Sequence, residues 1–144
     1  MANAKKGGRA SYGKGDFVVN LTAAITLTPG DSGKLFTLDQ DSSFDITLPT
    51  ASNAGIGWNA KFIVTDIGSG TVKVIPDSSE DTLIGMIVSA AGSEASAQSL
   101  ESGGDELIWV GGASGPGDWA ELFCDGSNFY VSGMIHDSDG ITIA

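Results

Sequence analysis

The sequence predicts an all-β domain, an antiparallel β-sandwich or barrel-like fold of about ten short strands, and three observations support this prediction. Apolar and polar residues alternate over short runs, which is the period of strands buried on one face. Turn signals rich in Gly, Pro, Asp and Ser separate these runs at intervals of about 8–12 residues. The 21 glycines are scattered rather than periodic, which indicates many turns and neither a collagen nor a linker.

In the first half of the chain, strands are expected at 17–28, 34–38, 44–48, 58–67 and 71–75. The alternation is clearest at 44–48, where Phe44, Ile46 and Leu48 fall on one face. Pro49 ends this strand because proline cannot donate a ladder hydrogen bond. Gly68-Ser69-Gly70 predicts a tight hairpin between the fourth and fifth of these strands.

In the second half, strands are expected at 83–88, 106–110, 119–124, 128–134 and 141–143. Asp125-Gly126 predicts a hairpin between the third and fourth of these, since glycine tolerates the positive φ that such turns need. Residues 89–99 are small and polar, and both helix and irregular β structure are compatible with them. No segment predicts a long helix, and no strong internal repeat is found.

Charge divides the chain into an extended basic N-terminal arm, residues 1–15, and a β domain, residues 16–144. The arm carries four basic side chains and no acid: Lys5, Lys6, Arg9 and Lys14. The rest of the chain holds three Lys and all 18 Asp and Glu. The arm has one aromatic residue, Tyr12, and too little apolar surface to fold alone. We expect it to become ordered on a larger partner.

Catalysis is not expected from the residue types present. The single cysteine, Cys124, lies in an apolar run and is expected to be a small buried hydrophobe. The single histidine, His136, is expected to be solvated near a turn. Asp137-Ser138-Asp139-Gly140 resembles the start of a calcium loop, but the twelfth position would lie beyond Ala144, so an Asp-capped turn is favoured. We expect no catalytic residues, no metal site and no cofactor.

Partner classes are narrowed by the same composition. The acidic body disfavours nucleic acid, because phosphate binding requires a basic face. No apolar run is long enough for a transmembrane helix, and no apolar segment follows the N-terminal charges as in a secretory signal. Synthesis in a cytoplasm is therefore expected. Trp58, Trp109 and Trp119 are expected in the core or an interface, with a sugar-binding surface as the alternative.

Two stretches of the sequence resemble small β domains of tailed-phage virion proteins, which occur in tail fibres and capsid-decorating proteins. The first runs from Ile46-Thr47-Leu48-Pro49 through Lys61-Phe62-Ile63-Val64 to Val74-Ile75-Pro76. The second is the closing segment 119–133, WAELFCDGSNFYVSG. The resemblance covers residues 21–133 and implies a trimer, without any catalytic residue to transfer.

These expectations favour a capsid decoration (cement) protein, which binds the outer capsid surface as a homotrimer and stabilises the shell. The expected capsid-binding residues are those of the arm: Lys5, Lys6, Arg9, Tyr12 and Lys14. The major capsid protein would be the partner and the virion surface the location. A domain that begins directly after a short arm, with no heptad segment, argues against a fibre shaft. The alternative is a tail-fibre, spike or other host-binding domain, with a host-surface glycan as its partner.

Overall fold

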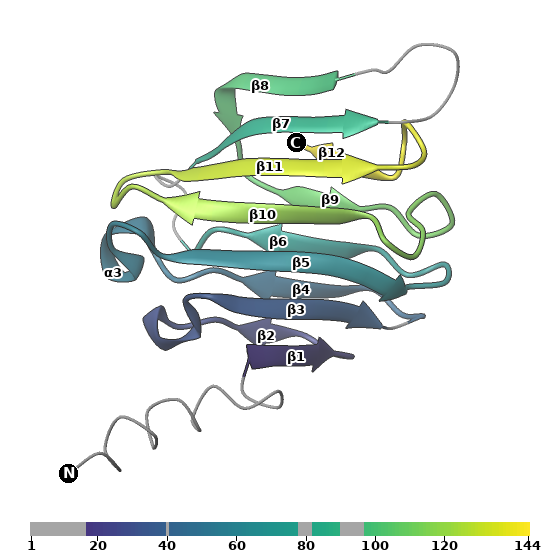
Figure 1. The fold of residues 1–144 in the computed structure, drawn as a ribbon, viewed down its shortest axis with the longest axis horizontal. Coiled ribbons are helices and arrows are strands. Elements are labelled where there is room, and N and C mark those ends of the chain that lie inside the picture. Colours follow the sequence, from purple (N-terminus) through teal and green to yellow (C-terminus); the bar gives the residue numbers. More distant parts are fainter. Residues whose placement is uncertain (1–16, 40, 78–81, 90–96) are drawn as a thin grey trace, which may run out of the picture.

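The computed structural model describes residues 17–39, 41–77, 82–89 and 97–144, and these form two β-sheets packed face to face (Figure 1). The seven-stranded sheet has the order β1-β3-β5-β10-β11-β7-β8 and the five-stranded sheet the order β12-β9-β6-β4-β2. The strands are β1 (Val18–Leu21), β2 (Ile25–Thr26), β3 (Lys34–Asp39), β4 (Phe44–Thr47), β5 (Asn59–Asp66), β6 (Val72–Ile75), β7 (Leu83–Ser89), β8 (Ala97–Gly104), β9 (Leu107–Trp109), β10 (Trp119–Cys124), β11 (Phe129–Ile135) and β12 (Ile141–Ile143). The described helices are short: η1 (Pro29–Asp31) and α3 (Ala51–Ala54).

The all-β prediction is confirmed, but the sheets are mixed rather than antiparallel. The first six strands alternate between the two sheets, so β1, β3 and β5 run parallel in one sheet and β2, β4 and β6 run parallel in the other. β11 and β7 form a further parallel pair. The pairs β5–β10, β10–β11, β7–β8, β6–β9 and β9–β12 are antiparallel.

The predicted hairpin at Gly68-Ser69-Gly70 is wrong, because β5 and β6 belong to different sheets. The connection is an arch that carries the chain across the sandwich. Both strands bury a full row of apolar side chains, with Phe62 and Val64 on one and Val72 and Val74 on the other. These rows meet each other through the core, which requires the strands to face one another rather than to pair. The run 17–28 is divided in the same way, into β1 and β2.

The predicted hairpin at Asp125-Gly126 is confirmed, and it joins β10 to β11 with Cys124 opposite Phe129. The carboxylate of Asp125 accepts hydrogen bonds from the backbone N–H groups of Ser127 and Asn128, both at 2.8 Å. Gly126 takes the positive φ of 95° that this turn requires. These backbone donors hold the pKa of Asp125 below its usual range.

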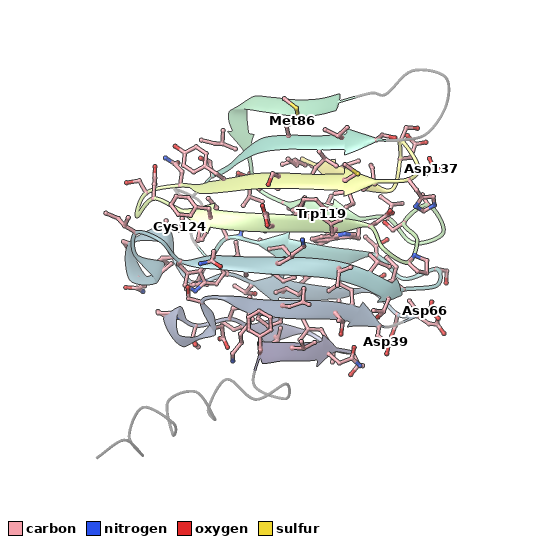
Figure 2. The ribbon with its side chains drawn as sticks, in the orientation of Figure 1. Asp39, Asp66, Met86, Trp119, Cys124 and Asp137 are labelled. Atoms are coloured by element: carbon pink, nitrogen blue, oxygen red, sulfur yellow. The ribbon has the colours of Figure 1, made fainter. Side chains whose placement is uncertain are left out.

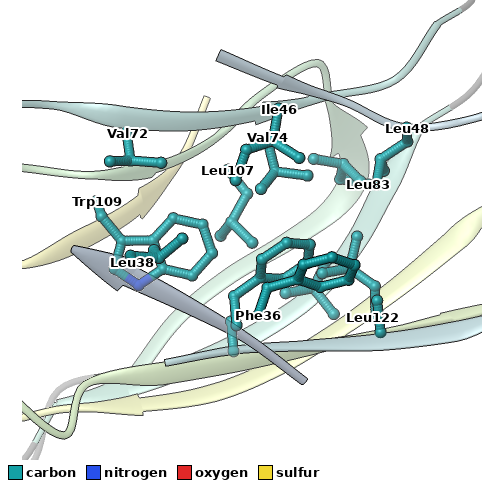
Figure 3. Close-up of a cluster of buried hydrophobic side chains, with 14 of the residues drawn as sticks. Phe36, Leu38, Ile46, Leu48, Val72, Val74, Leu83, Leu107, Trp109 and Leu122 are labelled. Carbon is teal, nitrogen blue, oxygen red and sulfur yellow. The ribbon is translucent and has the colours of Figure 1, made fainter. Parts of the chain in front are cut away.

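The core lies between the sheets and is built from the alternating inward residues of both (Figure 3). Phe62 is stacked on Phe36 at 5.2 Å between ring centroids and lies 5.8 Å from the Trp109 ring. The predicted inward face of β4 is confirmed, because Phe44, Ile46 and Leu48 are all buried. Such aromatic contacts contribute beyond the area that they bury.

Other expected core residues are also found in place. Cys124 is fully buried, as predicted. Trp58 is buried too, and its indole N–H donates to the carbonyl of Thr28 at 3.2 Å. Among the described residues, the indole nitrogen of Trp109 is the one buried side-chain nitrogen or oxygen without a hydrogen-bond partner.

Candidate interaction surface

The five residues predicted to bind a capsid, Lys5, Lys6, Arg9, Tyr12 and Lys14, lie outside the described residues. The first described residue is Phe17, and 47% of its surface is exposed. It directly precedes β1, which is an edge strand of the seven-stranded sheet (Figure 1). The described chain therefore begins at the border of the sandwich.

The outer face of the seven-stranded sheet is the most apolar surface among the described residues. In β10 and β11 the inward side chains are fully or nearly fully buried, which leaves Phe123, Tyr130 and Met134 on the outer side with 41–49% of their surfaces exposed. Met86 is exposed to a similar extent on β7. Figure 2 labels Met86, on β7, and Trp119, on β10. We call the outward side chains of β3, β5, β10, β11 and β7 the outer face.

Strand register arranges the outer face in three rows across the sheet. The first row is Thr37, Ile63, Trp119, Met134 and Val88, and the third is Asn59, Phe123, Tyr130 and Ile84. The middle row is Leu35, Lys61, Glu121, Ser132 and Met86. Two largely apolar rows therefore flank a row that holds one positive and one negative side chain.

The charged side chains of the middle row contact their neighbours. The ammonium group of Lys61 lies 4.1 Å from the centroid of the Trp119 ring, a cation–π contact. The hydroxyl of Ser132 donates to the Glu121 carboxylate at 3.3 Å. In the third row, the hydroxyl of Tyr130 donates to the carboxylate of Asp125 at 3.1 Å, which raises the pKa of Tyr130.

A groove of about 560 Å³ lies over the middle and third rows. Its apolar lining includes Phe17, Leu35, Phe123 and Tyr130, and its polar lining includes Asn59, Lys61, Glu121 and Ser132. This combination of aromatic surface and a few polar groups is typical of a binding site.

The outward surface of the five-stranded sheet is more polar. Its outward residues include Thr26, Asp45, Thr47, Lys73 and Thr142, with Ile75 and Ile108 half-buried among them. Lys73 donates to Glu106 at 2.8 Å, and this contact raises the pKa of Lys73. The two sides of the sandwich therefore differ, with the apolar outward surface on the seven-stranded sheet.

A hydrogen-bond network holds two loops together at one end of the sandwich. Asp118 is buried, and its carboxylate accepts from the backbone N–H groups of Gly115 at 2.9 Å and His136 at 3.0 Å. The Nδ1 atom of His136 lies 2.9 Å from the same carboxylate. This bond and the negative charge of Asp118 raise the pKa of His136. The hydroxyl of Ser114 donates to the Gly140 carbonyl rather than to the imidazole.

His136 therefore differs in part from the expectation of a solvated side chain. Its side chain is 61% exposed, as expected, but one ring nitrogen is paired with a buried carboxylate. The interpretation of 137–140 as an Asp-capped turn is confirmed, because Asp139 N–H donates to the Asp137 carboxylate at 3.2 Å and Gly140 N–H to the Asp137 carbonyl at 3.1 Å.

Acidic side chains gather at the same end of the sandwich, where Figure 2 labels Asp39, Asp66 and Asp137. The parallel strands β3 and β5 both end there in an aspartate. Within the described ranges, no group of three or more His, Cys, Asp or Glu is placed to hold a metal ion. In the same part of the chain, no helix has the length and apolar character needed to cross a membrane.

Comparison with models of protein families, with curated proteins and with solved structures finds no match to this chain. The resemblance to phage virion domains therefore remains a prediction from the sequence.

Sequence reasoning missed the outer face as a candidate site. The signal was present in the alternation of 119–124 and 128–134, where both faces of each strand carry large apolar residues. In a strand with one solvated face, the second face is expected to be polar. Phe123, Tyr130 and Met134 depart from that pattern, and each could have been identified as outward from the alternation alone.

Proposed function

We propose that this chain is a non-enzymatic structural protein of a phage virion, a capsid decoration (cement) protein that binds the outer capsid surface as a trimer. The observation that carries the proposal is the division between a basic arm and an acidic, all-β body. The arm would bind acidic surfaces of the major capsid protein through Lys5, Lys6, Arg9 and Lys14, with Tyr12 as an aromatic anchor.

The fold supports this role in two ways. The described chain begins beside the edge strand β1, so an arm that precedes it would leave the body at the border of the sandwich, away from the core. The body also presents an apolar outer face, which is suited to contacts with other proteins. A trimer with three arms would raise the effective concentration of the second and third arms once the first is bound.

Binding to capsids tests the proposal directly. The purified protein is mixed with particles that lack it, and the particles are sedimented and assayed for bound protein. We expect saturable binding that weakens as salt is raised, since exposed charge pairs are screened beyond about 8–10 Å at ordinary ionic strength. Absence of binding at micromolar protein would contradict the cement role.

A second candidate function is host binding by a tail-fibre or spike domain, and the groove on the outer face favours it. Phe123 and Tyr130 are cross-strand neighbours that expose their rings beside Asn59 and Lys61. Exposed aromatic faces next to polar groups can stack on sugar rings and fix their orientation. A glycan array probed with the purified protein tests this function, and an array without hits would count against it.

A further inference from the structure

We infer that the outer face of the seven-stranded sheet is the surface through which copies of this chain contact one another. This inference deepens the proposed function, since it assigns the contact surface of the expected oligomer and rests on that oligomer. The occupant of the face is thus a second copy of the chain, rather than a capsid subunit or a glycan.

Exposure of apolar side chains is the first argument. Phe123, Tyr130, Met86 and Met134 each expose more than two-fifths of their surface. They lie on three adjacent strands, β10, β11 and β7, and therefore form one continuous area. Contiguous apolar area of this kind marks a protein contact, and exposed aromatic residues and methionine are enriched in such contacts.

The size of the face is the second argument. Five strands at a spacing of about 4.8 Å, with about six residues each at about 3.4 Å, give a face of about 24 by 20 Å. This is about 480 Å² in projection, and the relief of the side chains adds to the accessible area. A stable interface buries about 800 Å² on each partner. The face thus matches a second folded domain better than a small ligand.

Charge is the third argument, and it selects a copy of the same chain. Three Lys and 18 acidic residues make the body strongly acidic, so two bodies repel each other over most of their surfaces. In the three rows of the outer face, Lys61 and Glu121 are the charged side chains, and they are direct cross-strand neighbours. The face is locally neutral there, and each charge can meet its opposite on a second copy.

The contrast with the other sheet is the fourth argument. The outward surface of the five-stranded sheet carries threonines and the Lys73–Glu106 ion pair, which are compatible with water. Its apolar residues Ile75 and Ile108 are half-buried by their neighbours. The outward surface of the five-stranded sheet is therefore suitable for control substitutions, because it is also formed by β-strands.

The test compares two double variants by sedimentation equilibrium, with circular dichroism and thermal melting as checks on folding. Phe123→Thr/Met134→Thr removes apolar surface from the outer face and keeps residues suited to strands. Ile75→Thr/Ile108→Thr makes the matched change on the opposite sheet. We expect the first variant to raise the dissociation constant of self-association by about tenfold or more and the second to leave it unchanged.

Several outcomes would overturn the inference. A wild-type protein that is monomeric at about 100 μM would do so, because interfaces of standard size have dissociation constants from micromolar to picomolar. A Phe123→Thr/Met134→Thr variant that associates normally would also do so. A monomeric wild type that gives a glycan-array signal, with the signal lost in the Phe123→Thr/Met134→Thr variant, would show that the face is a sugar site instead. Capsid binding is measured separately: a monomer that still binds capsids overturns the inference alone, whereas an oligomer that does not bind them overturns the proposed function.

Discussion

Asp118 is the residue on which the loop end of the sandwich depends. Its buried carboxylate accepts from two backbone N–H groups and faces the His136 ring. A buried carboxylate without such donors would cost several kcal/mol. Its partner His136 is 18 positions away, and nothing in the sequence indicates their contact. The sequence contains both residues, but their pairing cannot be predicted from it.

The pairing of His136 predicts a pH-dependent contribution to stability. Because its pKa is raised in the folded protein, protonated His136 stabilises the fold. This contribution is fully present below the unfolded pKa of about 6.5 and is lost as pH rises through the higher folded value. We expect the melting temperature of the wild type to exceed that of His136→Gln most at low pH, with the difference shrinking as pH rises above this range.

His136→Asn is a second non-titrating variant for this measurement. Its side-chain amide can replace the Nδ1–H donor but does not titrate, so the advantage of the wild type over this variant should also shrink as pH rises. A difference between wild type and His136→Gln that is constant from about pH 5 to 9 would show that protonation of His136 does not stabilise the fold.

Gly111 marks a close approach of two loops. A Cβ atom at Gly111 would lie 2.2 Å from the carbonyl oxygen of Ser69 and 2.3 Å from that of Gly70. Both contacts are to backbone, which cannot move aside as a side chain can. We expect Gly111→Ala to lower the free energy of unfolding by about 1–3 kcal/mol, the usual cost of overpacking.

Gly30→Ala is the control for this substitution, because a Cβ atom there would meet only the Thr28 hydroxyl oxygen at 3.6 Å. Denaturant unfolding should place Gly30→Ala within about 1 kcal/mol of wild type. Equal stability of the two variants would show that the loops around Gly111 can separate at little cost.

The strands themselves follow from the sequence, but their pairing does not. Alternation in 44–48 predicted the inward face of β4 correctly, since a period of two is a local property. Its actual neighbours are β2 and β6, both parallel to it, with Phe44 paired to Val72 of β6. The Gly68-Ser69-Gly70 turn is short enough for either a hairpin or an arch. Whether the chain forms a hairpin or an arch depends on which strand faces meet in the core, and no local sequence signal distinguishes the two.

We expect the body to fold without residues 1–15. The described core lies entirely within residues 21–143, so deletion of residues 1–15 should change the melting temperature by no more than about 2–4 °C, the shift expected from about 1 kcal/mol. Under the proposed function, the same deletion should abolish or strongly weaken binding to capsids that lack the protein.

A length-matched control separates the arm's charge from its length. Replacing Lys5, Lys6, Arg9 and Lys14 by Gln keeps the arm but removes its positive charge. We expect this variant to bind as weakly as the deletion at low salt. Unchanged capsid binding after deletion of residues 1–15 would show that the body, and not the arm, is the anchor.

The whole molecule is a sandwich with two unlike outer surfaces, and the sequence predicted the layers better than the surfaces. Buried residues alternate along each strand, so the presence of a core follows from periodicity, but the choice between a sandwich and a barrel-like fold does not. Which strands come to lie side by side depends on contacts between distant segments, such as β10 with β5. The three rows of the outer face exist only once that register is fixed.

At the scale of the particle, the proposed function predicts that the protein stabilises an expanded capsid without catalysing any reaction. Binding only to the mature shell stabilises that state by RT ln(1 + [L]/Kd), about 2.7 kcal/mol per site at a hundredfold excess over Kd. Over many sites this opposes the outward pressure of packaged DNA.

Particles with and without the protein are heated, and DNA release is followed with an intercalating dye. We expect decorated particles to release DNA at a higher temperature, and addition of the purified protein to stripped particles should restore that temperature. Release at the same temperature in both would remove the cement role and favour host binding.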